Sequence, residues 1–295
     1  MTNRPRIITA FCLILLITPL ITSCAATKTR MMVDSMSPLM EQMALSINKN
    51  IDVDMVRDAY PANLIQLDGL IEASPYNEDL LLKASEAYFG YSFAFIEDTD
   101  EERAKKLYLK SKDYALRALE KNRNFRRALN GPLDEFVSSL ETFNKKDVPA
   151  LFRCSTAWIA WIALNLHDPA VLLDLPKVEA IWTRILELDE TYYYGSTHAS
   201  LGAYFASQSL SMGGDPVKAK YHFDRAFEIS ESKLLVVHVM YAQYYAYQIQ
   251  DRKLYTDTLE HILSTPENLY PELNLINEIA KRKARILLDN VDMYF

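Results

Sequence analysis

The chain has 295 residues, of which 49% are hydrophobic and 24% charged, and its formal net charge is −7. An acidic chain lacks the basic surface that nucleic-acid binding needs, and charge does not draw it to an anionic membrane. With only 3 cysteines, it has no disulfide framework to replace a core. The fold must therefore rest on buried apolar side chains, which a chain of this length can supply.

The first segment has the pattern of a secretory signal peptide. Arg4 and Arg6 precede an apolar run over residues 7–21, which is shorter than the roughly 20 apolar residues of a transmembrane helix. The small residues before Cys24 resemble a lipobox, the cleavage and lipidation motif of bacterial lipoproteins. We expect residues 1–23 to be removed and Cys24 to carry lipid, which leaves a mature chain of charge −9. A plain secretory signal with an incidental cysteine is the alternative.

Residues 24–37 are mostly small and polar, and they predict a lipidated tether. Residues 38–295 predict a single all-α domain, because almost every segment has helical period and prolines fall between the periodic stretches. Residues 234–237 could form a strand, but the tyrosines that follow continue their apolar stripe at helical spacing. Residues 52–59 and 61–73 are expected to form two helices or one kinked helix. The other expected helices span residues 77–97, 101–121, a short stretch after Pro132, 149–166, 176–188, 192–210, 216–230, 233–250, 252–263 and 271–288.

Four of these helices share a triplet of small or apolar residues at i, i+4, i+7. The spacing is typical of the second helix of a tetratricopeptide repeat, whose period is about 34 residues. Any amphipathic helix can show this spacing, so the evidence lies in its recurrence beside aromatic-rich partner helices. The triplets are Ala104, Tyr108 and Ser111; Val178, Trp182 and Ile185; Ala219, Phe223 and Ala226; and Tyr255, Leu259 and Ile262.

Gly202 fits the first helix of such a repeat, where a glycine lets two helices approach closely. We expect Gly202 to pack near Phe223, with Ala219 and Ala226 at the same contact. The predicted architecture is a tetratricopeptide-like array of helical hairpins, an α-solenoid. Such arrays present an extended concave surface, and their usual function is to bind proteins or peptides.

No motif in the chain indicates catalysis. The five histidines have no metal-ligand spacing, and the phosphate-loop, dinucleotide and nucleophile-elbow motifs are absent from the sequence. We therefore predict no enzyme activity, no cofactor and no metal site. Cys154 has apolar neighbours and is expected to be a buried small hydrophobe; a reactive thiol is the alternative, but no basic cluster surrounds it.

Aromatic residues are frequent, and most should pack in the core of the helix array. Three consecutive tyrosines, Tyr192, Tyr193 and Tyr194, cannot all face the same way. Tyr247 leaves the stripe that the tyrosines before it form. We therefore predict that these four form part of a partner or ligand surface. The alternative, that all four belong to the core, stays open.

Several stretches, in this order and spacing, resemble the T-component (TatT) family of tripartite ATP-independent periplasmic (TRAP) transporters. The resemblance covers roughly residues 50–295, although Trp158-Ile159-Ala160-Trp161 departs from the pattern by lacking a glycine after the first tryptophan. The matching stretches are 60–64 and 67–70, 87–97, 103–108, 114–116, 188–189 with 193–195, 201–204, 213–216, 219–226, 241–245, 250–252 and 275–280.

The resemblance implies a lipid-anchored periplasmic protein that partners an extracytoplasmic solute-binding protein. It also implies assembly into a homo-oligomeric ring with a pore or groove for ligand hand-over. We predict an accessory component of a TRAP-type uptake system, anchored in the cell envelope through Cys24 and facing the periplasm. Ala25 after the cysteine favours the outer membrane. A scaffold lipoprotein for envelope protein assembly is the alternative, and an envelope hydrolase is a third possibility.

Overall fold

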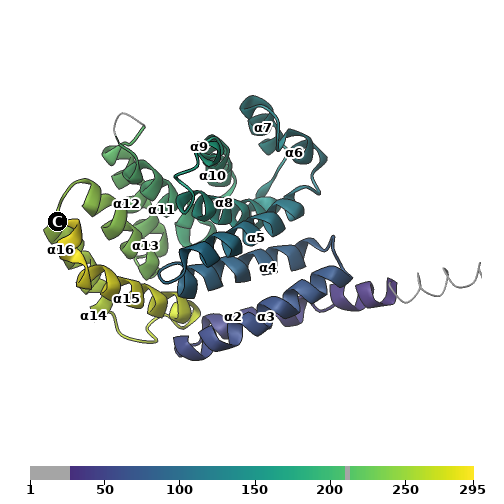
Figure 1. The fold of residues 1–295 in the computed structure, drawn as a ribbon, viewed down its shortest axis with the longest axis horizontal. Helices are drawn as coiled ribbons and strands as arrows, with labels where there is room; N and C mark the ends of the chain where they lie inside the picture. The colour runs from purple at the N-terminus through teal and green to yellow at the C-terminus, as the bar shows by residue number, and fades with distance from the viewer. Residues whose placement is uncertain (1–26, 210–212) are drawn as a thin grey trace, which may run out of the picture.

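The computed structural model describes residues 27–209 and 213–295, and these residues form helices joined by short loops (Figure 1). No strand occurs among them, so the predicted all-α class is confirmed, including a helix rather than a strand after residue 234. The elements are residues 27–34, α2 (Ser37–Asn48), α3 (Val53–Ala73), α4 (Glu78–Tyr91), η1 (Ser92–Ile96), α5 (Glu101–Leu119), α6 (Arg123–Ala128), α7 (Leu133–Leu140), η2 (Lys145–Asp147), α8 (Val148–Ala163), α9 (Pro169–Leu172), α10 (Leu175–Asp189), α11 (Tyr192–Ser207), α12 (Pro216–Ser230), α13 (Leu235–Met240), η4 (Tyr241–Ala246), α14 (Arg252–Ser264), η5 (Pro271–Leu273), α15 (Asn274–Asp289) and α16 (Val291–Tyr294).

Short polar side chains fix where many of these helices begin. Asn77 accepts a hydrogen bond from the Leu80 amide, and Asp100 accepts one from the Arg103 amide. Asp215 accepts from two amides of the first turn of α12, directly before Pro216. Each cap satisfies amides that have no partner inside the helix, so the sequence places these boundaries locally.

Consecutive helices pair as hairpins. α4 with η1 packs on α5, α8 packs on α10, α11 packs on α12, and α13 with η4 packs on α14. Successive hairpins also touch, through the pairs α5–α8, α10–α11 and α11–η4. In each hairpin we call α4, α8, α11 and α13 the first helices, and α5, α10, α12 and α14 the second helices. Their arrangement as a tetratricopeptide-type solenoid stays a prediction.

The four triplets lie at the contacts between these helices. All twelve side chains are at most 1% exposed. The triplets therefore belong to the hydrophobic core that both helices of each hairpin build, and a fully buried apolar side chain contributes about 1.5–3 kcal/mol relative to an exposed one.

The two ends of the array meet. α15 packs against α13 and α14 and also against α2 and α3. Val53 and Val56 of α3 are buried with Leu275 and Ile279 of α15, and Arg282 pairs with Asp54. At one end of the array α3 packs on α4, at the other end α15 packs on α13, and α15 also contacts α2 and α3 (Figure 1).

Part of the segment predicted to be a tether is described. Residues 27–34 are helical, and Val33 is 5% exposed in a core shared with α3 and α4. This part of the chain is therefore folded against the domain. Cys24 and the predicted signal peptide lie outside the described residues.

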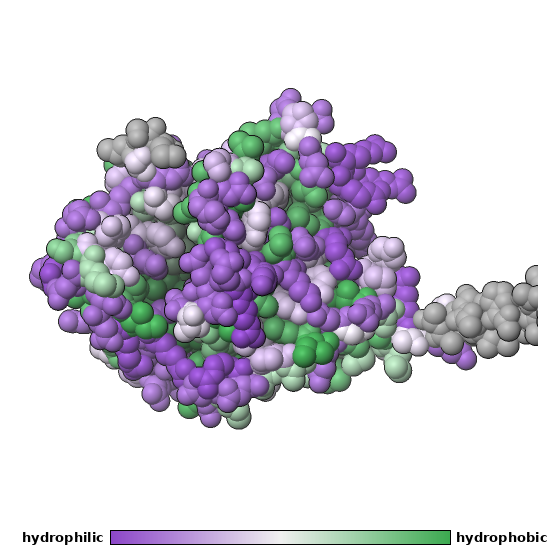
Figure 2. All heavy atoms as spheres, in the orientation of Figure 1, coloured by the Kyte–Doolittle hydropathy of each residue, from purple (hydrophilic) through white to green (hydrophobic). Residues whose placement is uncertain are grey.

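The surface in Figure 2 is mostly hydrophilic, with hydrophobic residues scattered between charged ones. Within the ranges that the structure describes, we find no helix that combines the length and the apolar character needed to cross a bilayer.

Candidate recognition surface

Three of the first helices depart from regular α-helical geometry. α4 continues into the π-helical segment η1, and α13 continues into the π-helical segment η4. α11 begins with three left-handed residues, Tyr193 (φ 46°), Tyr194 (φ 58°) and Gly195 (φ 71°). Because π-helical segments and left-handed non-glycine residues cost energy and recur at functional sites, this backbone marks a candidate site.

The left-handed turn has a clear structural reason at Gly195. A Cβ on this glycine would lie 3.0 Å from the Ile229 side chain of α12, so only glycine fits both the turn and the close approach of the two helices. The two tyrosines have no such freedom, and each costs about 1–2 kcal/mol in this conformation. Packing of their rings must hold them there.

The Tyr193 ring lies beside a buried charge. The Arg153 guanidinium of α8 lies 5.4 Å from the centre of the Tyr193 ring and 2.6 Å from a carboxylate oxygen of Glu86. Arg153 has 18% of its side chain exposed. Burial raises the pKa of Tyr193, and the positive charge of Arg153 opposes that rise. The guanidinium is thus held between a carboxylate and an aromatic ring.

Tyr60 of α3 completes this group. Burial raises its pKa, the Glu86 carboxylate adds to the rise, and the Arg153 guanidinium opposes it. Its ring stacks on Tyr91 at 5.7 Å between centres. We call Tyr60, Glu86, Arg153 and Tyr193 the Arg153 cluster. It brings together side chains from α3, α4, α8 and α11, and it offers hydrogen-bond donors, acceptors and ring faces.

A second charged group joins the two π-helical segments through α15. Lys283 Nζ lies 2.7 Å from Glu97 Oε1 and 2.7 Å from Asp98 Oδ2, and 4.5 Å from the centre of the Phe93 ring. Burial raises the pKa of Glu97, which Lys283 counteracts. Burial also raises the pKa of Tyr244 of η4, and the Glu97 carboxylate adds to it. α15 therefore holds the charged group that follows η1 and shares a core cluster with Ala242 and Ala246 of η4.

The four tyrosines predicted as a surface lie in two places. Tyr192 packs edge-on against Phe152 at 5.4 Å, next to Tyr193, and Tyr194 packs partly into the core of the α11–α12 hairpin. Tyr247 is 44% exposed and lies against the C-terminal rings of Tyr294 and Phe295. The three consecutive tyrosines thus stay together at the start of α11, with Tyr193 in the Arg153 cluster and Tyr194 in the α11–α12 core, and Tyr247 lies by the rings of Tyr294 and Phe295.

Gly202 lies against the ring of Phe223. A Cβ on Gly202 would stand 2.8 Å from Phe223 Cδ2, closer than any real contact, so a larger residue requires the helices to move. Ala219, Phe223 and Ala226 are 0% exposed.

Comparison with known proteins shows the family to which the chain belongs. The family model of the TRAP transporter T-component matches residues 49–295. The chain belongs to the TRAP transporter T-component family. A protein of Treponema pallidum (strain Nichols), described as uncharacterized, is 24% identical over 260 residues, which cover 83% of this chain and 80% of that protein. The family membership makes the chain a component of a transport system.

Sequence reasoning did not find the charged centre of the T-component's candidate site. Arg153 is the only charged residue of α8, within Val-Pro-Ala-Leu-Phe-Arg-Cys-Ser-Thr-Ala-Trp-Ile-Ala-Trp-Ile-Ala. A lone arginine in an otherwise apolar or small-residue helix was the available signal, since a buried charge needs a partner. Its partner Glu86 lies 67 residues earlier, so no local pattern joins them. Cys154 next to it is buried as predicted, and burial raises the pKa of its thiol to about 12.

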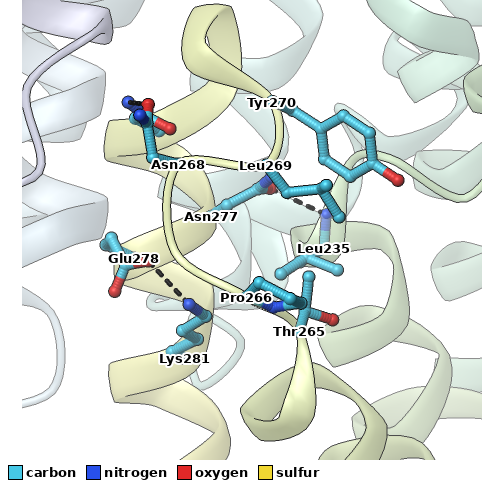
Figure 3. Close-up of a pocket in the computed structure, with 10 residues that line it drawn as sticks. Leu235, Thr265, Pro266, Asn268, Leu269, Tyr270, Asn277, Glu278 and Lys281 are labelled. Atoms are coloured by element: carbon cyan, nitrogen blue, oxygen red, sulfur yellow. Dashed lines mark hydrogen bonds and ion pairs between the residues drawn. The ribbon is translucent and has the colours of Figure 1, made fainter.

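Two hollows lie elsewhere in the T-component. One, between the α14–α15 loop and α15, has room for about a single water molecule, and its wall is closed by the bond from the Leu235 amide to Asn277 and by the Glu278–Lys281 pair (Figure 3). The other is an open groove of about 330 Å³ beside α12, α13 and α14, with His238 and His261 on its wall. Neither touches the Arg153 cluster.

Proposed function

We propose that this T-component is a lipid-anchored accessory protein that binds the extracytoplasmic solute-binding protein of a TRAP transporter and positions it near the membrane. The match to the T-component family over residues 49–295 carries this proposal. The lipobox pattern that ends at Cys24 supports the anchor, and Ala25 after it favours the outer membrane. The function is binding and positioning without a chemical step, in a homo-oligomer facing the periplasm.

We place the docking or ligand contact at the left-handed turn of Tyr193, Tyr194 and Gly195 and at the Arg153 cluster. Rings at a left-handed turn are rigid, and a tyrosine presents both an apolar face and a polar hydroxyl to a partner. The Arg153 guanidinium, held against a carboxylate, adds directional hydrogen bonding. Because the mature chain is acidic, aromatic contacts are the more effective anchors for an acidic partner. Tyr247 belongs to the same proposal as a separate contact.

Binding is tested with the mature chain and a TRAP-type solute-binding protein from the same organism. Tyr194→Ala and Tyr247→Ala should weaken capture in a surface-binding assay, while circular dichroism shows unchanged helicity. Tyr221→Ala is the matched control, because Tyr221 is 62% exposed on the second helix α12. Equal capture by all variants would contradict the proposed contact, and loss of helicity with loss of capture would assign the two tyrosines to the core.

The anchor is tested separately by metabolic labelling with a fatty acid. Wild-type chain should take up label, and Cys24→Ser should not. Label retained in the Cys24→Ser variant would contradict lipidation at this residue.

A further inference from the structure

The N-terminal helices carry an apolar side that the protein leaves uncovered. Met36, Leu39 and Met43 recur at i, i+3 and i+7 from the N-cap of α2 onward, which puts them along one side of that helix, and Met32 lies just before the turn in the preceding helix of residues 27–34. Three of them are at least half exposed: Met32 at 63%, Leu39 at 58% and Met43 at 50%. We call these four residues the methionine flank.

The opposite flank of the same segment is polar, and it holds the segment to the protein. Asp34 accepts hydrogen bonds from Ser74 Oγ at 2.7 Å and Asn77 Nδ2 at 2.6 Å. Glu41 pairs with Lys83 of α4 at 2.6 Å, and Ser37 donates to Asp79. A surface helix usually turns its apolar side to the protein and its polar side to solvent. Here the arrangement is partly reversed, because polar side chains contact the domain while three large apolar side chains are exposed.

Chain length places this flank close to the lipid. Only Ala25 and Ala26 separate Cys24 from Thr27, which is the first described residue and is helical. Three residue steps span at most about 10 Å, so the start of the helix lies within that distance of the cysteine that would carry acyl chains. Met32 follows five residues later, about 8 Å further along a helix. The methionine flank is thus within reach of the bilayer surface.

We infer that the methionine flank lies in the lipid headgroup–acyl boundary and fixes the orientation of the T-component on the membrane. This inference rests on lipidation at Cys24 from the proposed function. An amphipathic helix parallel to the membrane buries its apolar side about 5–10 Å into this boundary. Methionine suits the position because its unbranched side chain adapts to an irregular environment. Lys28, one turn before Met32, can reach the headgroups while its stem stays among apolar groups.

The experiment uses the full lipidated chain in phosphatidylcholine–phosphatidylglycerol vesicles. Leu39→Cys and Met43→Cys are each labelled with an environment-sensitive fluorophore. Cys154 does not compete, because it is buried and burial raises its pKa to about 12. Leu45→Cys is the matched control, since Leu45 is 41% exposed on α2 but on another side of it, and Val217→Cys, 80% exposed on α12, is the remote control.

We expect labels at 39 and 43 to emit at shorter wavelength and to be quenched by lipids with nitroxide-labelled acyl chains, while labels at 45 and 217 emit as in water. Protein that floats with the vesicles but gives the same spectrum at all four positions overturns the inference and leaves the anchor intact. Protein that does not float overturns the anchor and this inference with it. A blue shift at 39 and 43 in the lipid-free Cys24→Ser protein, growing with its concentration, assigns the flank to a second copy and also overturns the inference.

Discussion

The two helices of a hairpin differ in regularity. The second helices α5, α10, α12 and α14 are uninterrupted, and each carries a fully buried triplet. Among the first helices, α4 and α13 run into π-helical segments and α11 begins with a left-handed turn. The fourth, α8, is regular but holds the buried Arg153.

This difference bears on both packing and recognition. Regular helices with small and apolar residues at fixed spacing can stack hairpin on hairpin, because their surfaces fit without local distortion. Distorted helices change the directions of their side chains, and the resulting backbone strain must be offset by the surrounding packing. Both sets of helices therefore build the core, and the first helices combine core packing with the proposed binding function.

The largest expected effect concerns the contact between the first helix α11 and the second helix α12. His198 Nδ1 of α11 and His222 Nδ1 of α12 lie 2.9 Å apart, so one nitrogen donates a hydrogen bond that the other must accept, and both rings cannot be charged. Burial lowers the pKa of His222 to about 4, with the nearby His198 adding to the effect. Because the unfolded chain binds a proton near pH 6.5 and the folded chain does not, stability is fully present above pH 6.5 and falls as pH drops toward 4.

His222→Gln should remove this loss. Between pH 7 and pH 4.5 the free energy of unfolding of the wild type should fall by about 2–3 kcal/mol more than that of the variant. Urea unfolding at both pH values measures the difference. The exposed His167→Gln is the control and should follow the wild type. If the His222→Gln variant loses as much stability between pH 7 and pH 4.5 as the wild type does, the histidine pair does not contribute to acid sensitivity.

The second prediction tests the contact between Gly202 and Phe223. Gly202→Leu should lower the free energy of unfolding by about 1–3 kcal/mol, because added atoms must displace a fully buried ring. Gly69→Leu is the matched control, since a Cβ on Gly69 of α3 has no heavy atom within 4 Å. Thermal unfolding of both variants decides the matter: a Gly202→Leu melting curve like that of the wild type would show that the predicted repeat alignment is wrong.

The smallest expected effect compares backbone strain in a first and a second helix. At Tyr194 the glycine variant should be more stable than the alanine variant by about 1 kcal/mol, because a residue with a Cβ resists the left-handed conformation. At Tyr221 of α12 the order should reverse by a similar amount, because alanine is the better residue in a regular helix. At each position the glycine and alanine variants both lack the tyrosine ring, so the loss of ring contacts cancels in the difference between their stabilities. Denaturant unfolding of the four variants measures both differences, and the same order at both positions would contradict the strained turn.

The amino-acid sequence by itself determined the regular part of this protein. Helical period, proline positions and capping residues such as Asp215 act over a few residues, so the predicted helix over residues 216–230 has the same bounds in the structure. The triplets could be found for the same reason, since i, i+4, i+7 spacing is a property of one helix. Family membership over residues 49–295 could likewise be anticipated from the order of short stretches.

Only the tertiary structure decided the irregular part. The left-handed turn at Tyr193–Gly195 opposes the local preference of tyrosine, and ring packing and the close approach of Ile229 hold it in place. The Arg153 cluster joins residues 60, 86, 153 and 193, and no local rule connects positions so far apart in the chain. The methionine flank has helical spacing in the sequence, but its exposure depends on which side of the segment meets α4. Burial and long-range pairing are properties of the assembled helices, because they are set by what lies across a contact rather than along the chain.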